Sequence, residues 1–451
     1  MAIKGGRVID PAQGVDRVAD VLIANGKIEQ VTEKSAEKAP DGYEQIDAKG
    51  LIVSPGFVDL HTHLRDPGQE WKETIATGTQ AAAQGGFTTV CAMPNTDPVQ
   101  DTASVIEDVM RRAATEGVVR VLPIGAISVG QHGKRLAPMG ELAEVGVIGF
   151  SDDGNPVTDA NLMRQALAYS VELGLPIINH AEDKQIGRGG VMNAGPAATR
   201  LGLAGVPAEA ETAMVTRDLH LADLTRARLH IPHISTIGSI VALRTAKECG
   251  VDVTAEVTPH HLTLTDDWVF GEKGVVPETI GSRGYDTDTK VNPPLRSKAD
   301  VDAVIEALAE GLIDIVATDH APHAATDKVC TYNEAAHGIN VLETAFSSVY
   351  SLAGVDSGKL SLVRLIESLT AGPAAILGRD LGSLKKGFSA DVTLIDPNSK
   401  WTVDPTAFAS KSVNSPLAGV ELTGRVVTTI YRGETVFDLK TSAQSGSRTS
   451  A

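Results

Sequence analysis

Short apolar runs alternate with segments of helical periodicity through the middle of this 451-residue chain. The runs that predict strands are Phe57–His61, Thr88–Met93, Val119–Ile124, Gly146–Phe150, Leu175–Asn179, Arg228–Ile231, Asp252–Val257 and Ile313–Thr318. Helical candidates lie between many of them, at Ala160–Leu173, Ala208–His220 and Ala299–Glu310. Such alternation predicts a parallel sheet, and eight strand–helix units predict an α/β fold of the (β/α)8, TIM-type barrel kind. A doubly wound sheet alternates similarly, but no Gly-x-Gly-x-x-Gly segment follows the first run.

Both ends of the chain have a different pattern, with short strand-like runs and turns. The early runs are Gly6–Asp10, Ala19–Ile23 and Gly26–Val31, and the late ones are Ala390–Asp396 and Val426–Gly433. Asn25-Gly26 between two of the early runs is a strong hairpin signal. We therefore expect residues 1–54 and 379–440 to form one small β-sandwich domain, with the barrel in residues 55–378. The Ser/Thr-rich tail, residues 441–451, is expected to be disordered.

The composition of the chain bears on its binding partners and on its cellular compartment. The formal net charge is −17, from 40 basic and 57 acidic residues, which argues against nucleic acid or an anionic membrane as partner. The three cysteines, Cys91, Cys249 and Cys330, are widely spaced, which suits a reducing cytoplasm better than a disulfide framework. The N-terminal residues contain no apolar signal region, and no apolar run reaches the ~18 residues of a membrane span. A cytoplasmic protein is expected.

Histidines and aspartates follow several of the predicted strands at one register. They are His61 and His63 after the first run, Asn95 after the second, Ser151–Asp153 after the fourth, His180 after the fifth, His233 after the sixth and Asp319–His323 after the eighth. In a (β/α)8 barrel the carboxyl ends of the strands form the active site, so these side chains should converge. His and carboxylate ligands without cysteine suit a catalytic zinc-type site. Six ligands exceed one tetrahedral ion, which favours two ions whose charge attracts an anionic substrate.

Four longer motifs carry a resemblance to a known family. Gly56–His63 resembles the opening signature of the cyclic amidases in the amidohydrolase superfamily. His63–Gly68, Met93–Thr96 and Ala317–His323 resemble the bacterial class I dihydroorotases more closely still. The similarity continues through Ser415–Gly419 and Gly433, so it covers nearly the whole chain.

The resemblance implies a reaction and a set of metal ligands. The reaction is the reversible cyclisation of N-carbamoyl-L-aspartate to L-dihydroorotate, a step of pyrimidine (UMP) synthesis. Implied zinc ligands are His61, His63 and Asp319 for one ion, His180 and His233 for the second, and Asp153 as the bridging carboxylate. Asp319 is also the implied general base and acid, acting on a bridging hydroxide. Asp152 competes with Asp153 for the bridging role.

The resemblance also implies the substrate-binding residues, which are His63, Arg65, Asn95, Asn292, His323, His337 and Gly338. Arg65, Asn95 and His323 are expected to bind the free carboxylate of the substrate. Asn292 and the backbone around His337 and Gly338 are expected to hold the ring amide groups. For His260 and His261, which follow the seventh run, we expect a structural or pocket-lining role rather than metal binding.

One departure and several alternatives follow from the same motifs. Many superfamily members bridge their metals with a carbamylated lysine after the fourth strand, but Gly149–Gly154 contains no lysine. Hydantoinase, dihydropyrimidinase and allantoinase are the alternative activities, and a non-catalytic homologue that organises aspartate transcarbamoylase is an alternative of another class. Zinc, cobalt, manganese and iron all suit such ligands. The family implies a homodimer and a possible association with aspartate transcarbamoylase.

Overall fold

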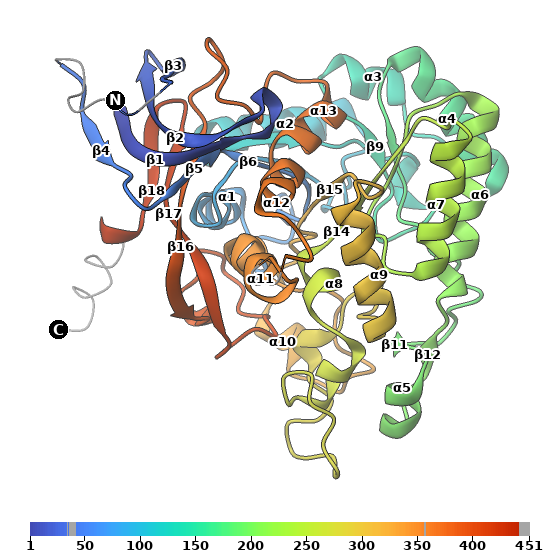
Figure 1. The fold of residues 1–451 in the computed structure, drawn as a ribbon. Helices are drawn as coiled ribbons and strands as arrows, with labels where there is room; N and C mark the ends of the chain where they lie inside the picture. The colour runs from blue at the N-terminus through green and yellow to red at the C-terminus, as the bar shows by residue number, and fades with distance from the viewer. Residues whose placement is uncertain (34, 36–41, 356–357, 442–451) are drawn as a thin grey trace.

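A ring of parallel strands occupies the middle of the chain in the computed structural model, which describes residues 1–33, 35, 42–355 and 358–441 (Figure 1). In spatial order the strands are β6 (Phe57–Thr62), β7 (Phe87–Ala92), β8 (Arg120–Pro123), β9 (Phe150–Ser151), β10 (Ile177–Ile178), β13 (Leu229–Ile231), β14 (Val253–Val257) and β15 (Ile315–Val316). Parallel bridges from Gly125 to Phe150 and from Thr62 to His320 close the ring. The predicted (β/α)8 barrel is confirmed, and each strand overlaps a predicted run.

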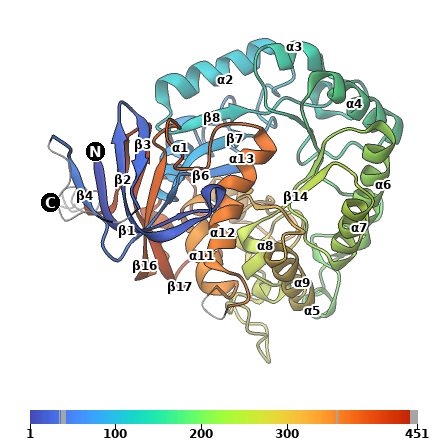
Figure 2. The ribbon, with the colours of Figure 1, turned by 45° about the horizontal axis from the view of Figure 1, so that its top comes forward.

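Helices surround this ring, and in Figure 2 α2, α3, α4, α6 and α7 form an arc around the strands. The longer helices are α1 (Ile75–Gln84), α2 (Ala103–Glu116), α3 (Met139–Glu144), α4 (Ala160–Leu173), α6 (Glu209–Thr225), α7 (Ile237–Glu248), α9 (Lys298–Ala309), α11 (Ala345–Leu352), α12 (Leu362–Leu369) and α13 (Ala371–Leu377). Helix α4 begins where the Asp159 side chain accepts hydrogen bonds from two backbone N–H groups, and it ends at Gly174, whose φ is 68°. Helix α6 runs past the predicted end at His220 because Ala222 continues its buried face.

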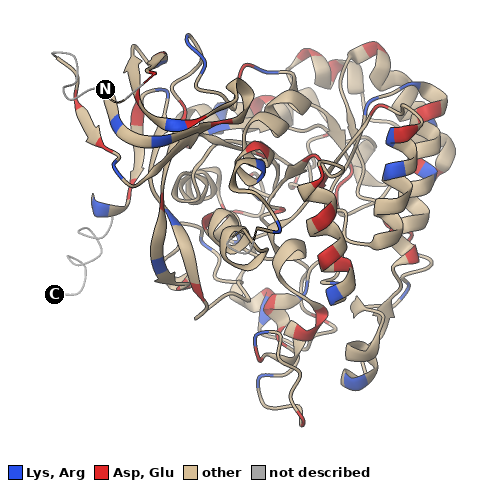
Figure 3. Cartoon of the chain, viewed as in Figure 1, with Lys and Arg blue, Asp and Glu red and all other residues tan. Residues whose placement is uncertain are grey.

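Shorter elements fill the loops at the carboxyl ends of the strands. They are β11 (Met192–Asn193), β12 (Gly205–Val206), α5 (Pro196–Leu201), α8 (Pro259–Thr263) and α10 (Ala325–Lys328). Charged residues of both signs are interspersed on the outer helices rather than gathered on one face (Figure 3). Across the described residues, no helix combines the length and the apolar character that crossing a bilayer requires.

Strands from both chain ends join one sheet beside the barrel. Its strands are β1 (Ala2–Asp10), β2 (Val15–Ala24), β3 (Lys27–Val31), β4 (Gln45–Asp47), β5 (Ile52–Pro55), β16 (Val392–Thr402), β17 (Glu421–Tyr431) and β18 (Glu434–Asp438). The order is β18-β17-β16-β5-β1-β2-β3, with β4 paired to β1. Asn25 and Gly26 have φ values of 53° and 70°, as the predicted two-residue hairpin between β2 and β3 requires. This sheet confirms that strands from both chain ends join in one β part beside the barrel, which is a single eight-stranded sheet where a sandwich was expected.

The sheet and the barrel share one apolar core. Phe57 of β6 packs against Phe87 and Phe346 with ring centroids 5.5 and 5.9 Å apart, and the same buried cluster includes Ile52 and Val426 of the sheet. The sheet is therefore seated on the barrel by continuous apolar packing. The domain limits 1–54, 55–378 and 379–440 stay a proposal, and residues 442–451 of the expected disordered tail lie outside the described residues.

Candidate metal centre

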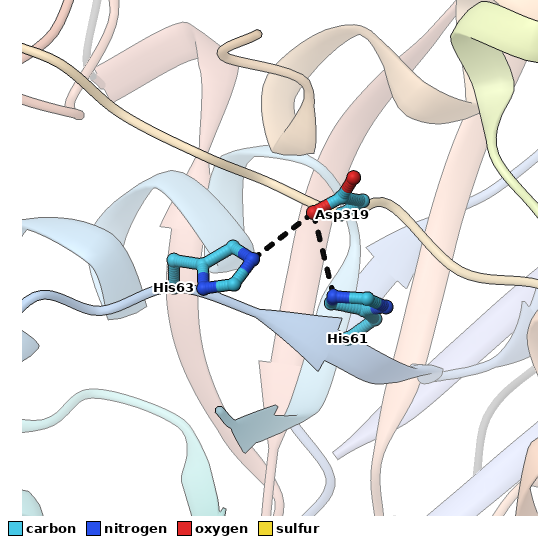
Figure 4. A group of neighbouring side chains, drawn as sticks. All are labelled: His61, His63 and Asp319. Carbon is cyan, nitrogen blue, oxygen red and sulfur yellow. Dashed lines mark hydrogen bonds and ion pairs between the residues drawn. The ribbon is translucent and has the colours of Figure 1, made fainter. Parts of the chain in front are cut away.

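Two histidines at the end of β6 meet an aspartate that follows β15. Asp319 Oδ1 lies 3.0 Å from His63 Nε2 and 3.4 Å from His61 Nε2 (Figure 4). The rings of His61 and His63 have centroids 5.3 Å apart, as expected for neighbours that leave one face of a strand. The register of β6 against β7 shifts between Asp59 and Thr62, an irregularity of the kind that re-aims side chains next to active sites.

A second group of side chains lies against the first. Asp153, His180 and His233 follow β9, β10 and β13, and His180 Nδ1 lies 2.9 Å from His233 Nε2. Asp153 Oδ1 is 3.5 Å from His180 Nδ1, 3.7 Å from His233 Nε2 and 3.5 Å from His61 Nε2. Asp153 therefore lies between the two groups, and the barrel brings all six predicted ligand residues together.

The donor atoms of these side chains fit metal ions. Those of His61, His63 and Asp319 lie within 4.8 Å of one another, and so do those of His61, Asp153 and His233. His61 Nε2 and Asp153 Oδ1 are buried without a hydrogen-bond partner among the described residues. Buried polar atoms normally find partners, so two such atoms that face each other call for a ligand between them. Imidazole and carboxylate donors suit zinc and related divalent ions.

The charges of the histidines act on the two aspartates of this centre. Burial alone would raise the pKa of Asp319, but the charges of His61 and His63 lower it below its ordinary value. Burial likewise opposes the ionised form of Asp153, yet His61 and His180 hold its pKa well below the usual range. Both carboxylates therefore stay ionised, which is the form in which a carboxylate binds a metal ion.

Two of the histidines are oriented by acceptors on their far nitrogens. His63 Nδ1 lies 2.8 Å from Asn95 Oδ1, and His180 Nε2 lies 3.4 Å from Glu182 Oε2. An acceptor at one ring nitrogen holds the hydrogen there and leaves the other nitrogen free to bind a metal. Glu182 was not predicted, although a charged residue two positions after His180 is a signal in the sequence.

Asp152 and Asp153 have different surroundings. Asp152 accepts hydrogen bonds from the backbone N–H groups of Ile127 and Ser128, at 2.8 and 3.0 Å, and from the Ser128 hydroxyl. It thus anchors the loop after β8, while Asp153 faces the histidines. Burial raises the pKa of Asp152 to about 6.

Three residues of the centre adopt a backbone conformation that L-residues rarely take. The φ values of Arg65, His233 and Asp319 are 62°, 36° and 47°. Such conformations cost on the order of 1–3 kcal/mol each and cluster at functional sites, where the surroundings hold them. The strain therefore falls on the residues predicted to do the chemistry.

Arg65 and His323 meet beside the first group. Arg65 is 8% exposed, its Nε donates to Pro322 O at 3.2 Å, and its Nη2 lies 3.4 Å from His323 Nε2. The same nitrogen of His323 lies 2.9 Å from the carbonyl oxygen of His337. Lys72, which was not predicted, lies 3.5 Å from His323 Nδ1. Asp327 Oδ2 lies 3.4 Å from Lys72 Nζ and 3.4 Å from His323 Nδ1, so Lys72 already has an acidic partner and Arg65 is the cation that this corner offers to an anion.

The other predicted substrate residues lie close to the histidines but already have partners. Asn292 Nδ2 donates to Glu182 Oε2 at 2.9 Å and lies 3.3 Å from His180 Nε2. The Gly338 N–H donates to the Lys290 carbonyl, and the Gly338 carbonyl accepts from Asn414. A Cβ at Gly338 would meet the Ala321 carbonyl oxygen at 2.6 Å, so this close packing requires glycine.

His260 and His261 differ although they are neighbours on α8. His261 lies 2.7 Å from Thr258 Oγ1 and 3.0 Å from the Pro293 carbonyl, which is a structural arrangement. Both ring nitrogens of His260 are buried without hydrogen-bond partners among the described residues. Burial lowers the pKa of His260 well below its ordinary value, so the ring is neutral.

Sequence comparison identifies close relatives. A family model described as dihydro-orotase-like matches residues 50–239. A dihydroorotase from Anaeromyxobacter dehalogenans is 51% identical over 436 residues, which cover 97% of each chain. A dihydroorotase from Geobacter metallireducens is 49% identical over 437 residues, covering 97% of this chain and 99% of the relative.

Solved structures of related cyclic amide hydrolases have a similar fold. An L-hydantoinase (dihydropyrimidinase) from Arthrobacter aurescens superposes with a TM-score of 0.83 at 26% identity, covering 97% of this chain and 96% of that one. A dihydropyrimidinase from Brevibacillus agri gives a TM-score of 0.82 at 25% identity, with coverages of 97% and 95%. With half of all residues identical to dihydroorotases over nearly its full length, the chain belongs to the dihydroorotase family of cyclic amide hydrolases.

Proposed function

We propose that this protein interconverts L-dihydroorotate and N-carbamoyl-L-aspartate in de novo pyrimidine synthesis. The full-length similarity to proteins named dihydroorotase supports the reaction. The observation that carries the substrate assignment is Arg65, a buried guanidinium beside the candidate metal ligands. Burial lowers its pKa to about 10, which leaves it charged at neutral pH. A hydantoin or an uncharged dihydropyrimidine has no carboxylate for such a group, whereas dihydroorotate has one.

Six side chains form the proposed binding site for two zinc ions. His61, His63 and Asp319 would hold one ion, His180 and His233 the other, and Asp153 would bridge them. Bound divalent ions polarise a carbonyl group and lower the pKa of a water molecule, which is what amide hydrolysis requires. The buried, unpartnered atoms of His61 and Asp153 support this assignment.

Asp319 is the proposed general base and acid. In hydrolysis the water oxygen bonds to the ring carbonyl carbon while Asp319 accepts the water proton. The ring C–N bond then breaks, and Asp319 returns the proton to the leaving nitrogen. The lowered pKa of Asp319, caused by His61 and His63 against the effect of burial, keeps this carboxylate ionised at neutral pH, which is the form that a general base requires.

The proposed substrate site surrounds these groups. Arg65 binds the free carboxylate with two parallel charge-assisted hydrogen bonds, assisted by Asn95 and His323. His63 lies at the edge of the same site through its hydrogen bond to Asn95. Asn292 and the backbone at residues 337–338 would hold the ring amide groups, which requires them to exchange some present partners for substrate.

The cellular setting is also a proposal. The three cysteines form no disulfide in the structure, and Cys249 and Cys330 are exposed, which suits a reducing cytoplasm. A homodimer and an association with aspartate transcarbamoylase are proposed from the family.

The test compares two substrates in an Arg65→Ala variant with metal added. We expect kcat/KM for dihydroorotate to fall by about 10²–10⁴, because losing a charge-assisted carboxylate contact costs roughly 2–5 kcal/mol. Any turnover of an uncharged hydantoin should change far less.

Two further variants make the comparison specific. Arg65→Lys keeps the charge but loses the forked geometry and should be intermediate. Arg112→Ala removes an arginine that pairs with Asp66 and Asp108 outside the centre, and it should affect both substrates equally. Equal losses on both substrates in Arg65→Ala would refute the carboxylate role, and a metal-replete wild type without turnover would refute the enzyme.

A further inference from the structure

A buried glutamate lies behind the candidate metal ligands. Glu256 is the penultimate residue of β14 and is 1% exposed. Its Oε1 lies 2.7 Å from His61 Nδ1, the ring nitrogen that faces away from Asp153 and Asp319. Glu256 was not predicted, although a charged residue within the otherwise apolar end of the run Val253–Val257 is a signal in the sequence.

The second carboxylate oxygen of Glu256 also has a histidine partner. Oε2 lies 3.0 Å from His230 Nε2, and His230 Nδ1 lies 2.8 Å from Thr254 Oγ1. The adjacent strands β13 and β14, together with β6 on the other side of β15, therefore contribute to one hydrogen-bonded chain. No lysine or arginine among the described residues forms an ion pair with Glu256, so its charge is balanced only from the side of the histidines.

Hydrogen-bond chemistry decides what this chain does to His61. An ionised carboxylate only accepts, so both contacts to Glu256 are donated by ring N–H groups. A neutral His61 that donates from Nδ1 has its lone pair on Nε2. Nε2 is the atom that faces Asp153 and Asp319 without a hydrogen-bond partner among the described residues. When a metal ion takes the place of the Nε2 proton, the contact to Glu256 keeps the remaining ring hydrogen of His61 on Nδ1.

We propose that Glu256, anchored by His230, is a positioning residue that fixes His61 as an Nε2 metal ligand and places a negative charge behind it. The inference rests on the proposed metal-dependent function. Burying a carboxylate costs free energy, because the charge loses its hydration. An apolar residue of similar volume often stabilises the fold equally well, so a purely structural role does not account for Glu256. Carboxylates that orient a ligating imidazole raise its basicity, and their loss commonly costs about 10–100-fold in metal affinity or activity.

The experiment measures metal binding directly in Glu256→Gln. Glutamine can still accept from His61, but it carries no charge. We expect zinc affinity, measured by competition with a chelator, to fall by about 10–100-fold with the fold retained. The visible spectrum of the cobalt-loaded variant should shift, since the ligand field of His61 changes. Because Glu256 is not expected to touch substrate, the KM for dihydroorotate in metal-saturated protein should stay close to that of wild type.

Two other variants complete the test. His230→Leu removes only the anchor of Glu256, so we expect a smaller loss of zinc affinity than in Glu256→Gln. Glu343→Gln is the matched control, because its buried carboxyl contacts no candidate ligand and burial raises its pKa to about 8, which makes it neutral at pH 7. It should leave zinc affinity unchanged.

The outcomes separate this inference from the proposed function. A wild-type protein that holds no zinc or hydrolyses no dihydroorotate would overturn the proposed function itself. Wild-type binding and turnover, together with unchanged zinc affinity and an unchanged cobalt spectrum in Glu256→Gln, would overturn only the role of Glu256. Wild-type affinity in His230→Leu would remove His230 from the proposal.

Discussion

Two sites of the molecule contain buried polar atoms that lack hydrogen-bond partners among the described residues. The two sites differ in the charged groups that surround these atoms. At the barrel mouth, His61 Nε2 and Asp153 Oδ1 lie 3.5 Å apart, within a group of acids and imidazoles. At Glu343, between the barrel and the sheet formed by both chain ends, Oε1 accepts a hydrogen bond from the Ala409 N–H at 2.8 Å. Its Oε2 has no hydrogen-bond partner among the described residues. The first site gathers charges from many strands, whereas at the second burial acts on one carboxyl group, and the charge of Glu73 adds to the rise in its pKa.

The carboxyl groups of the two sites have different protonation states. Burial raises the pKa of Glu343 to about 8, so this carboxyl group becomes neutral by keeping its proton. Asp153 and Asp319 have lowered pKa values, because the neighbouring histidines favour their ionised forms against the effect of burial. Unpartnered buried atoms therefore indicate a bound ion where several charged groups converge. At Glu343, protonation of the carboxyl group is enough to remove the buried charge.

The largest expected effect tests that convergence. His61 belongs to both candidate metal groups, whereas His233 belongs to one. We expect His61→Asn to lose the ion proposed between His61, His63 and Asp319, to weaken binding of the other ion, which it borders, and to reduce dihydroorotate turnover by about 10³-fold or more, while His233→Asn loses only the other ion and keeps about half of the bound metal. Elemental analysis of purified protein and a spectrophotometric assay of ring opening check both expectations.

His132→Asn is the control for these substitutions, because it replaces an exposed histidine outside both groups. It should keep the wild-type metal content and turnover. Two ions bound to His61→Asn with wild-type affinity would show that His61 is not a ligand of the first ion.

A middle-sized effect should follow removal of the metal. Without a cation, the buried carboxylates of Asp153 and Asp319 repel each other, so chelation should lower thermal stability. Ion binding to the folded state at 100 to 1,000 times Kd contributes about 3–4 kcal/mol. Calorimetry before and after chelation, and after zinc is restored, measures this change. Glu343→Gln should show the same difference as wild type, and a midpoint that chelation leaves unmoved would contradict a structural contribution of the metal.

The smallest effect concerns stability at Glu343 alone. Its folded pKa of about 8 lies above its ordinary value of 4.5. The stabilisation from its bound proton is therefore complete below pH 4.5 and is lost as the pH rises to about 8. Glu343→Gln has no such proton to lose, so relative to wild type it should gain stability between pH 5 and pH 8.

The expected gain in Glu343→Gln is a few kcal/mol, on the order of 1.4 kcal/mol for each unit of pKa difference. Denaturant midpoints of both proteins at pH 5 and pH 8 check it, and turnover at pH 7 should stay unchanged. A stability difference that is the same at both pH values would mean that the Glu343 carboxyl is ionised in the folded protein.

Much of the fold follows from local pattern. Apolar runs placed all eight barrel strands, because buried parallel strands need apolar side chains on both faces. Asn25-Gly26 determined its hairpin, because these residues accept positive φ at low cost. The end of α6 was placed too early, since the continued burial of Ala222 depends on the neighbouring helices rather than on local propensity.

The sequence by itself determined which residues stand at the carboxyl ends of the strands, since strand register sets that position, and so it brought His61, His63, His180, His233 and Asp319 to one mouth. Only the tertiary structure decided what each of them faces. Asp152 turns to the loop after β8 while Asp153 meets the histidines, and Glu256 reaches His61 across 195 positions of sequence. The physical reason is that a side chain's direction is local, whereas its partners depend on the closure of the ring and on the shifted register of β6.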